Sequence, residues 1–429
     1  MKPKLLIITP IIPYPLDEGG KVSQFYFLEY LQYYLDIHMI FLINSYLENS
    51  YADKLSEMLS DVTIHKIKNY ETSEDQARIH PISKTLFLKR IYWKFMDLFL
   101  KKNDHDSIFI ANEKKTDDFD RPIEFLNTFS RDIINSISKL IEIINPDILQ
   151  IEHNPFLNLI EFIQHKKTIF VEHEIQFGRL LSISKTKFTA FEKYKIEINR
   201  TIESALLNKY KMILCFSKDD RKLLIENNVT TITKISPFPI PNETFQIPTL
   251  EQKIIKKIIF VGGSSHYPNY DAIVWYIDNI AQDVYKKTGL KFHIIGKCQI
   301  NLIEKYANYE YVVFEGYVDN LFEACTNSIM VVPLRMGSGI RTKILYGMAQ
   351  QLPIISTEIG CEGLGSKNNE DIIIANTPLE FKTQILFLKE NQEIANKIGE
   401  SSYKFAIENF SQKKLSERRL DLYKMLLNS

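Results

Sequence analysis

The chain has 429 residues, of which 45% are hydrophobic and 25% are charged, a composition that is typical of globular proteins and excludes wholesale disorder. The 53 basic residues balance the 53 acidic ones, so the net charge gives no reason to expect nucleic acid as a partner. A chain of this length exceeds one compact core, and we therefore expect two domains with a cleft between them.

The first half of the sequence alternates between predicted strands and helices. Apolar runs at 5–9 and 37–43 predict strands, and residues 21–35 between them place apolar side chains near helical spacing. Such units build parallel sheets, whose ligands bind at the carboxyl ends of the strands. The loop before the first helix, which ends in Gly19 and Gly20, is therefore a candidate site. Further strands are predicted at 147–153, 167–173 and 211–217.

The second half begins after a proline-rich segment. Residues 235–248 contain four prolines and no periodicity, which is typical of an interdomain linker. Alternating units follow it, so the sequence predicts a second doubly wound α/β domain. Its predicted strands lie at 256–263, 290–297, 311–318, 328–334 and 352–358.

Cysteine usage and the apolar runs indicate where the protein works. The four cysteines form neither a CxxC pair nor a cluster with zinc spacing, which is typical of reduced cysteines in a cytoplasmic protein. Residues 1–15 begin like a signal peptide, but their apolar run is interrupted by Pro10, Pro13 and Pro15. No apolar run reaches the ~18 residues of a membrane-spanning helix. We expect a cytoplasmic protein.

Residues 83–102 predict an amphipathic helix with a basic face. Leu88, Tyr92 and Phe95 share one side, and Arg90 lies on another. Helices of this composition lie at anionic membrane surfaces. The segment is therefore a candidate for peripheral contact with the inner face of the cell membrane, and an ordinary helix packed on the core is the alternative.

The sequence RMGSGIRTK, between a predicted strand and a helix that we expect to begin near Ile340, has the composition of an anion site. Its glycines permit close backbone approach, and the first turn of a helix favours negative charge. Its arginine and lysine add positive charge, which suits a diphosphate. The alternative is a serine that caps the helix beside two solvated cations. The candidates are Gly337, Ser338, Gly339, Arg341 and Lys343.

Three segments carry a resemblance to a known family: FVGGSSHYPNYDAIVWYIDNI, VFEGYVDNLFEAC and VVPLRMGSGIRTKILYGMAQQLPIISTEIGCEGL. In this order they resemble the carboxyl-terminal half of group 1 glycosyltransferases, the retaining family-four enzymes of GT-B fold. ITPIIPYPLDEGGKVSQF and VEHEIQFGRL resemble parts of the amino-terminal half. The resemblance implies two Rossmann-like doubly wound domains that face each other across a cleft. It assigns 1–242 to the acceptor and 243–407 to the nucleotide sugar, with a helix at about 408–429 packing back on the first domain.

The resemblance also implies the chemistry. A sugar would move, with retained configuration, from a nucleotide-sugar donor to a glycan or lipid-linked acceptor in bacterial surface polysaccharide synthesis. His173 would contact that sugar, and Arg341 and Lys343 would stabilise the departing diphosphate. Neither a metal nor a cofactor is expected. The donor-binding residues would be Gly19, Gly20, Gly263, His266, Asp319, Gly337, Ser338, Gly339, Tyr346 and Glu362.

Each candidate also has a plain structural alternative. His173 could be a buried hydrogen-bonded histidine, His266 an exposed loop residue, and Asp319 a cap for the next helix. Tyr346 stands where the family usually has a glutamate, which favours altered or lost activity. The competing hypotheses are therefore a nucleotide-sugar epimerase of the same fold and a catalytically inactive donor-binding or partner subunit.

Metal motifs are weak in this sequence. The DHD at 104–106 and the DFD at 118–120 match the DxD of metal-dependent glycosyltransferases in letters, but both lie in a charged loop instead of after an apolar strand. HEIQF lacks the second histidine of a HExxH zinc motif. His153, which follows a predicted strand as His173 does, is more typical of a buried hydrogen-bonded histidine.

Overall fold

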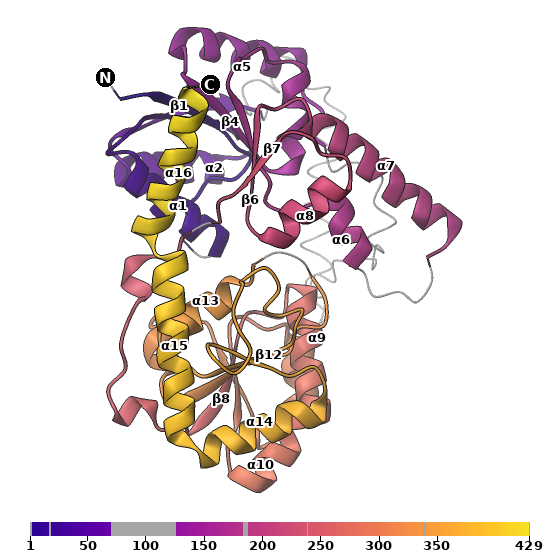
Figure 1. The fold of residues 1–429 in the computed structure, drawn as a ribbon, viewed down its shortest axis with the longest axis vertical. Helices are drawn as coiled ribbons and strands as arrows, with labels where there is room; N and C mark the ends of the chain where they lie inside the picture. The colour runs from indigo at the N-terminus through magenta and orange to yellow at the C-terminus, as the bar shows by residue number, and fades with distance from the viewer. Residues whose placement is uncertain are drawn as a thin grey trace, which may run out of the picture.

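The computed structural model describes residues 2–16, 19–69, 126–182, 188–237, 239–337 and 340–428, which form two parallel β-sheets. Figure 1 shows one sheet with its helices above the other. The first sheet is, in spatial order, β3 (Val62–Lys68), β2 (Asp36–Ile43), β1 (Lys4–Ile8), β4 (Ile148–Glu152), β5 (Thr168–Val171), β6 (Met212–Cys215) and β7 (Ile232–Ile235). The second sheet is β10 (Val312–Gly316), β9 (Phe292–Ile295), β8 (Lys257–Val261), β11 (Ser328–Val332), β12 (Ile354–Ser356) and β13 (Ile373–Ile374).

Each sheet is buried on both faces by helices. In β1, Leu5 and Ile7 enter one core cluster while Leu6 and Ile8 enter the other, as alternation along a strand requires. The helices of the first domain are α1 (Gly19–Leu31), α2 (Tyr46–Met58), α5 (Arg131–Ile144), α6 (Gln176–Ser182), α7 (Ala190–Leu207) and α8 (Lys218–Glu226). Those that follow are α9 (Tyr267–Tyr276), α10 (Gln282–Thr288), α11 (Ile300–Tyr306), α12 (Leu321–Cys325), α13 (Thr342–Ala349), α14 (Pro378–Glu390), α15 (Gln392–Phe410) and α16 (Gln412–Leu427).

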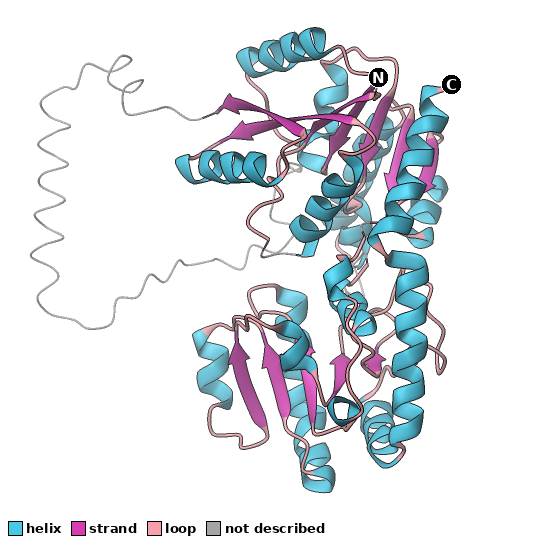
Figure 2. Cartoon of the chain, turned by 90° about the vertical axis from the view of Figure 1, so that its left-hand side faces the viewer, coloured by secondary structure: helices cyan, strands magenta, loops and turns pink. Residues whose placement is uncertain are grey.

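In each sheet the strand order reverses beside the first strand of that domain. Strand β1 pairs with β2 and β4, and β8 pairs with β9 and β11. Ligands of open parallel sheets bind outside the carboxyl ends of the strands near such a reversal. The arrowheads of the second sheet point toward the first domain in Figure 2. The loops that follow β8 and β11 are therefore turned toward the other half of the molecule.

The chain crosses between the two halves twice, and the two crossings touch. The first sheet ends at Ile235, the second begins at Lys257, and the segment between them forms the linker. Within this linker, the Ile240 backbone N–H donates to the Phe410 carbonyl at 2.8 Å, and Ile240 bridges to Ser411, the residue between α15 and α16. Figure 1 shows α15 beside the second domain and α16 beside the first.

Helix α16 belongs to the core of the first domain. Leu420, Tyr423 and Leu426 pack in the same cluster as Leu5 of β1. The buried Arg419 guanidinium donates to the carbonyl of Ser236 at 2.9 Å and also to its hydroxyl. The terminal helix is thereby fixed to the end of the linker that leaves the first domain.

Some sequence predictions fall on residues outside the described ranges. These are the amphipathic segment 83–102, the acidic triplets at 104–106 and 118–120, and the loop residues Ser338 and Gly339. In the part of the chain that is described, no helix is long and apolar enough to cross a membrane.

Candidate functional site

Two partly buried cations lie at the start of α13, after the loop that follows β11. Arg341 is the N-cap residue of this helix, and Lys343 lies in its first turn. The Lys343 ammonium donates to Asn269 Oδ1 at 2.6 Å and lies 4.2 Å from the centroid of the Phe260 ring. A helix N-terminus favours negative charge, and two cations within its first turn extend that preference. These groups therefore form a concentrated positive region at the edge of the second sheet.

Glycines leave the room that these side chains occupy. Gly262, at the end of β8, has a φ of +142°, and a Cβ there would lie 2.7 Å from Lys343 Nζ. Gly337 has a φ of +107°, and a Cβ there would approach the Arg341 guanidinium to 3.2 Å. At Gly263 a Cβ would meet the Lys297 carbonyl oxygen at 2.5 Å. A side chain at these positions would displace the cations or the neighbouring backbone.

Burial and mutual repulsion weaken the charged forms of these groups. Burial, and then the Arg341 charge, lower the pKa of Lys343 to about 7. Burial also lowers the pKa of Arg341. His266 precedes α9 and is exposed, as the alternative of an exposed loop residue predicts; partial desolvation, Lys343 and Arg341 lower its pKa in that order. A bound anion would reverse these effects because it favours every protonated form.

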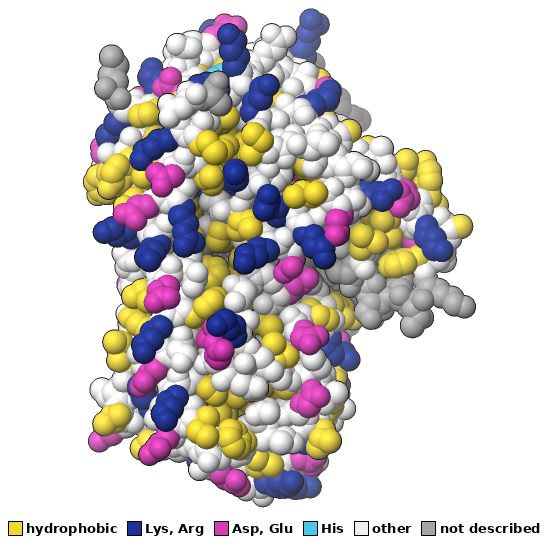
Figure 3. All heavy atoms as spheres, viewed as in Figure 1, with side chains coloured by type: hydrophobic (Ala, Val, Ile, Leu, Met, Phe, Trp, Pro, Cys, Tyr) yellow, Lys and Arg dark blue, Asp and Glu magenta, His cyan; other side chains and the backbone are white. Residues whose placement is uncertain are grey.

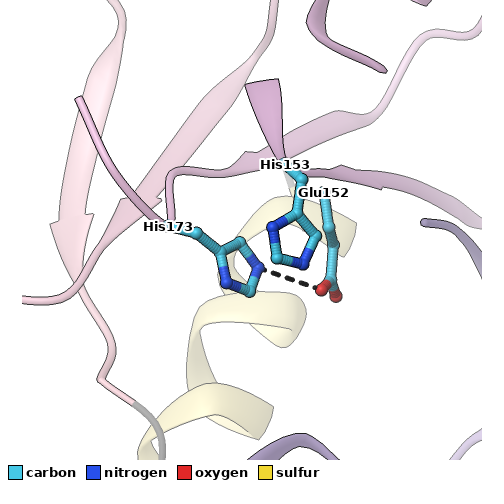
Figure 4. Close-up of side chains that lie close together, drawn as sticks. All are labelled: Glu152, His153 and His173. Carbon is cyan, nitrogen blue, oxygen red and sulfur yellow. Dashed lines mark hydrogen bonds and ion pairs between the residues drawn. The ribbon is translucent and has the colours of Figure 1, made fainter. Parts of the chain in front are cut away.

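On the first domain, Glu152, His153 and His173 lie together at the carboxyl ends of β4 and β5, as Figure 4 shows. His173 Nε2 lies 3.2 Å from Glu152 Oε2, and the two imidazole rings stack with their centroids 3.5 Å apart. Burial, and then the Arg419 charge, lower the pKa of His173 to about 3. The imidazole is therefore neutral at pH 7, and a hydrogen bond joins its Nε2 to the Glu152 carboxyl, whose pKa is raised by burial.

A chain of hydrogen bonds connects this group to the terminal helix. Glu152 accepts from Gln24 Nε2 at 2.8 Å and from Gln150 Nε2 at 2.6 Å. Gln150 in turn accepts from the hydroxyl of Tyr423 in α16 at 2.7 Å. The orientation of His173 thus depends on residues from three separate parts of the chain.

The same three residues are, in the described ranges, the group whose ligand atoms could surround a metal ion, all within 4.8 Å of one another. The imidazole planes are only 20° from parallel, so their in-plane lone pairs run side by side instead of converging. Both carboxylate oxygens of Glu152 already accept hydrogen bonds. This arrangement fits an oriented histidine better than a metal centre.

A pocket of about 310 Å³ joins the two domains beside these residues. Its first-domain wall includes Glu172, His173 and the start of α8, and its second-domain wall includes Glu362 and Gly363. Gly363 has a φ of +77°, and a Cβ there would lie 2.9 Å from the Cβ of Ser217. The domains are therefore in close contact at one side of the pocket.

Comparison with known sequences decides the family of the second domain. Residues 255–391 match the family described as Glycosyl transferases group 1. The second domain is a group 1 glycosyltransferase domain. The matched residues include Arg341, Lys343 and Glu362.

Two curated relatives extend the likeness of this glycosyltransferase domain. A Klebsiella pneumoniae protein, named an uncharacterized 44.6 kDa protein in the cps region, is 25% identical over 169 residues, which span 37% of this chain and 43% of the relative. An uncharacterized glycosyltransferase of Methanocaldococcus jannaschii is 25% identical over 283 residues, which span 61% of this chain and 69% of the relative. The aligned part thus covers less than half of the Klebsiella protein.

Solved glycosyltransferases share the whole two-domain architecture. S. aureus TarM has a TM-score of 0.65 at 15% identity, with full coverage of both chains. HepE of Anabaena has a TM-score of 0.63 at 10% identity and covers 98% of this chain and 100% of its own. Sucrose-phosphate synthase of Thermosynechococcus elongatus has a TM-score of 0.64 at 11% identity, again with full coverage. The chain has the GT-B fold of glycosyltransferases.

The other residues that the sequence predicted for the site include Asp319, Tyr346 and Gly20. Asp319 is exposed, and the alternative that it caps α12 is wrong, because the Asn320 side chain accepts from the Glu323 backbone N–H at 3.1 Å. Burial, and then Glu243 in the linker, raise the pKa of Tyr346 to about 12. Gly20 is exposed in the first turn of α1, and nothing lies within 4 Å of a Cβ built there.

Sequence reasoning missed several residues of this region. Asn269, which holds Lys343, follows Gly263 by six positions and carries no motif that singles it out. Glu152 directly precedes His153, and Glu172 directly precedes His173. This repeated Glu-His pair at two strand ends was the available signal that the two glutamates belong to the site. Their burial could not be read from the sequence, because it depends on helices that pack from elsewhere in the chain.

Proposed function

We propose that the protein is a retaining glycosyltransferase that moves a sugar from a nucleotide-sugar donor to a glycan or lipid-linked acceptor. The observation that carries the proposal is that the partly buried side chains of Arg341 and Lys343 lie two residues apart at the start of α13. A cation that has lost part of its hydration is stabilised by an anion, and an arginine fork beside a lysine suits a diphosphate. The second domain would hold the donor and the first the acceptor.

The chemistry follows from where charge develops. When the bond from the anomeric carbon to the diphosphate oxygen breaks, the departing group gains negative charge next to Arg341 and Lys343. Interactions that strengthen in this transition state raise the rate. The acceptor hydroxyl forms the new bond to the anomeric carbon and passes its proton to the departing phosphate. The neutral His173 would contact the transferred sugar, and His266, Gly263 and Gly337 would border the diphosphate.

The relatives support the class of substrate. HepE was solved with UDP-glucose, and TarM was solved with UDP together with α-GlcNAc-glycerol. The Klebsiella relative is named for the cps region, which supports a role in bacterial surface polysaccharide synthesis. The proposed location is the cytoplasm, with peripheral contact to the inner face of the cell membrane through residues 83–102.

The proposal is tested by donor binding followed by transfer. A thermal-shift panel of UDP-, GDP-, ADP- and TDP-sugars should single out one base, because a ligand of the native state raises the melting temperature. Labelled donor of that base should then yield labelled glycan only when acceptor is added. Donor binding without transfer to any acceptor would instead support the inactive-subunit hypothesis that Tyr346 motivates, and failure of every nucleotide to bind would refute the donor site.

A further inference from the structure

The pocket between the domains is strongly acidic. One of the described residues that line it is a lysine, Lys222, and its ammonium nitrogen lies 3.8 Å from a carboxylate oxygen of Glu226. The lining contains neither an aromatic ring other than His173 nor a side-chain amide, the groups that often hold neutral sugars. Six carboxyl side chains line it: Glu172, Glu174, Asp219, Asp220, Glu226 and Glu362.

Two of these carboxyls have a structural reason to be there. Asp219 and Asp220 lie in the first turn of α8, where the helix dipole favours negative charge, and the Asp220 backbone N–H donates to the Ser217 hydroxyl at 2.9 Å. Their presence alone therefore indicates no ligand.

Glu172 has no such reason. Its side chain is only 2% exposed, and Oε1 accepts a hydrogen bond from the Glu174 backbone N–H at 3.3 Å. Its second oxygen, Oε2, is buried and has no hydrogen-bond partner among the residues that are described. Leaving a buried polar atom unsatisfied costs free energy, which a ligand that donates a hydrogen bond would recover.

The surrounding charges indicate which kind of donor this atom would accept. Burial, and then the carboxyl of Glu203, raise the pKa of Glu172, and Asp220 adds to the effect. Burial also raises the pKa of Glu362, although Arg341 opposes it. A cationic ligand would relieve this repulsion, whereas a neutral hydroxyl would leave it in place. Among the residues described, these carboxyls do not converge within the distance of a metal cluster, so a metal ion is a poorer fit than a larger cation.

We propose that this pocket binds an acceptor sugar that carries a free amino group, and that Glu172 accepts a hydrogen bond from its ammonium. Most of the lining belongs to the first domain, on the side that the proposed function gives to the acceptor, and the inference rests on that function. Glu362, which lines the pocket, is close enough to Arg341 for the two charges to interact, so the ammonium and the donor diphosphate would occupy neighbouring regions of opposite charge. The amino group acts here in recognition, and the transfer step is unchanged.

The test compares three probes that share one sugar ring and differ in the substituent at C2. The methyl glycosides of glucosamine, N-acetylglucosamine and glucose are titrated into the full chain in the presence of UDP, with binding followed by saturation-transfer NMR. We expect the glucosamine probe to bind about tenfold more tightly than either neutral probe. Equal or tighter binding of a neutral probe, or no binding of the glucosamine probe, would overturn the inference. If the thermal-shift panel selects another base, its nucleoside diphosphate replaces UDP, and failure of all four diphosphates to bind would refute the proposed donor site instead.

Substitutions distinguish recognition of the amino group by Glu172 from a general effect of negative charge on the domain. Glu172→Gln keeps the shape of the protonated acid, and it should remove the preference for glucosamine over glucose. Glu161→Gln, which removes an exposed carboxylate paired with Lys209 on the same domain, is the matched control and should keep the preference. If Glu172→Gln melts far below the wild type, Glu362→Gln on the opposite wall takes its place. A preference retained in the Glu172→Gln or Glu362→Gln protein would also contradict the inference.

Discussion

The molecule has a positive wall, formed by Arg341 and Lys343 of the second domain, and a negative wall, formed by side chains of the first domain. The positive wall comes from one short loop and the start of one helix, where Arg341 and Lys343 are two residues apart. The first-domain wall assembles carboxyls and imidazoles from separate strand ends, among them Glu152 and Glu172. A local motif therefore specifies the positive wall, whereas only the folded sheet creates the negative one.

The largest effect should come from removing the positive wall. In the double variant Arg341→Ala, Lys343→Ala, turnover should fall by about 10³-fold or more, because two groups that stabilise the departing diphosphate are lost. The melting temperature should change little or rise, since two partly buried charges that repel each other are also removed. Lys382→Ala, which breaks a surface pair with Asp283 in the same domain, is the control and should keep full activity. Unchanged kinetics in the folded double variant would contradict the assignment.

The titration of Lys343 sharpens the comparison. Its pKa of about 7 means that the free protein loses this charge as the pH rises above 7, so donor binding must then take up a proton. We expect the Kd of the bound nucleotide sugar to rise by up to about tenfold for each pH unit above 7. Calorimetry at several pH values measures this. Lys343→Arg should flatten the dependence because its guanidinium stays charged, and equal slopes in both proteins would count against the proposal.

The protonation of His173, on the negative wall, should be measurable through the pH dependence of the free energy of unfolding. The pKa of His173 is about 3 in the folded chain and ordinarily 6.5, so as the pH falls below 6.5 the unfolded state binds the proton first and the native state is destabilised. The contribution of His173 to the free energy of unfolding should decline by up to about 1.4 kcal/mol for each pH unit between 6.5 and 3. Glu203, whose pKa is raised to about 7, acts oppositely, since its protonated form is favoured in the native state and stability is lost as the pH rises from 4.5 to 7.

The contribution of His173 is therefore measured as a difference. Urea unfolding of the wild type and of His173→Gln at pH 7 and pH 5 cancels the shared contribution of Glu203. The wild type should lose more stability than the variant on acidification. A parallel loss in both proteins would show that His173 titrates normally.

The smallest expected effect concerns metal. Because the stacked rings of His153 and His173 do not direct their lone pairs to one point, a chelator should change neither turnover nor melting temperature. Activity and thermal unfolding before and after dialysis against EDTA check this, with added Zn²⁺ and Mg²⁺ as the reverse test. A loss that one of these ions restores would overturn this interpretation of the cluster.

Much of the central fold was predictable because buried parallel strands are continuous apolar runs. The strands expected at 5–9 and 37–43 correspond to Lys4–Ile8 and Asp36–Ile43. Strand β3 was missed because it lies at the edge of its sheet and alternates exposed polar residues such as Thr63 and Lys66. Strand β13 was missed because it is only two residues long.

The site was predictable where one segment supplies it. The loop and helix that carry Arg341 and Lys343 were recognised from adjacent letters, and the helix expected to begin near Ile340 begins at Thr342, with Arg341 as its N-cap. The pocket was not predictable, because it needs Glu172, Ser217 and Gly363 to meet from three loops. Neither periodicity nor spacing encodes contacts of that range. The roles of the predicted site residues and of the two domains remain predictions.

The interdomain linker and the junction of α15 and α16 touch at Ile240 and Ser411, and this contact restricts how the two domains can move. Because both connections lie at one place, opening and closing of the domains reduce to rotation about a single pivot. Sliding of one domain along the other would break the Ile240–Phe410 hydrogen bond. Arg419 anchors α16 at that same pivot through Ser236, whose backbone N–H donates to the Cys215 carbonyl at 2.8 Å, so the contact of Ser217 with Gly363 lies close to the pivot. A fluorophore pair placed on the parts of the two domains farthest from the linker would therefore register their rotation more sensitively than one near the terminal helix.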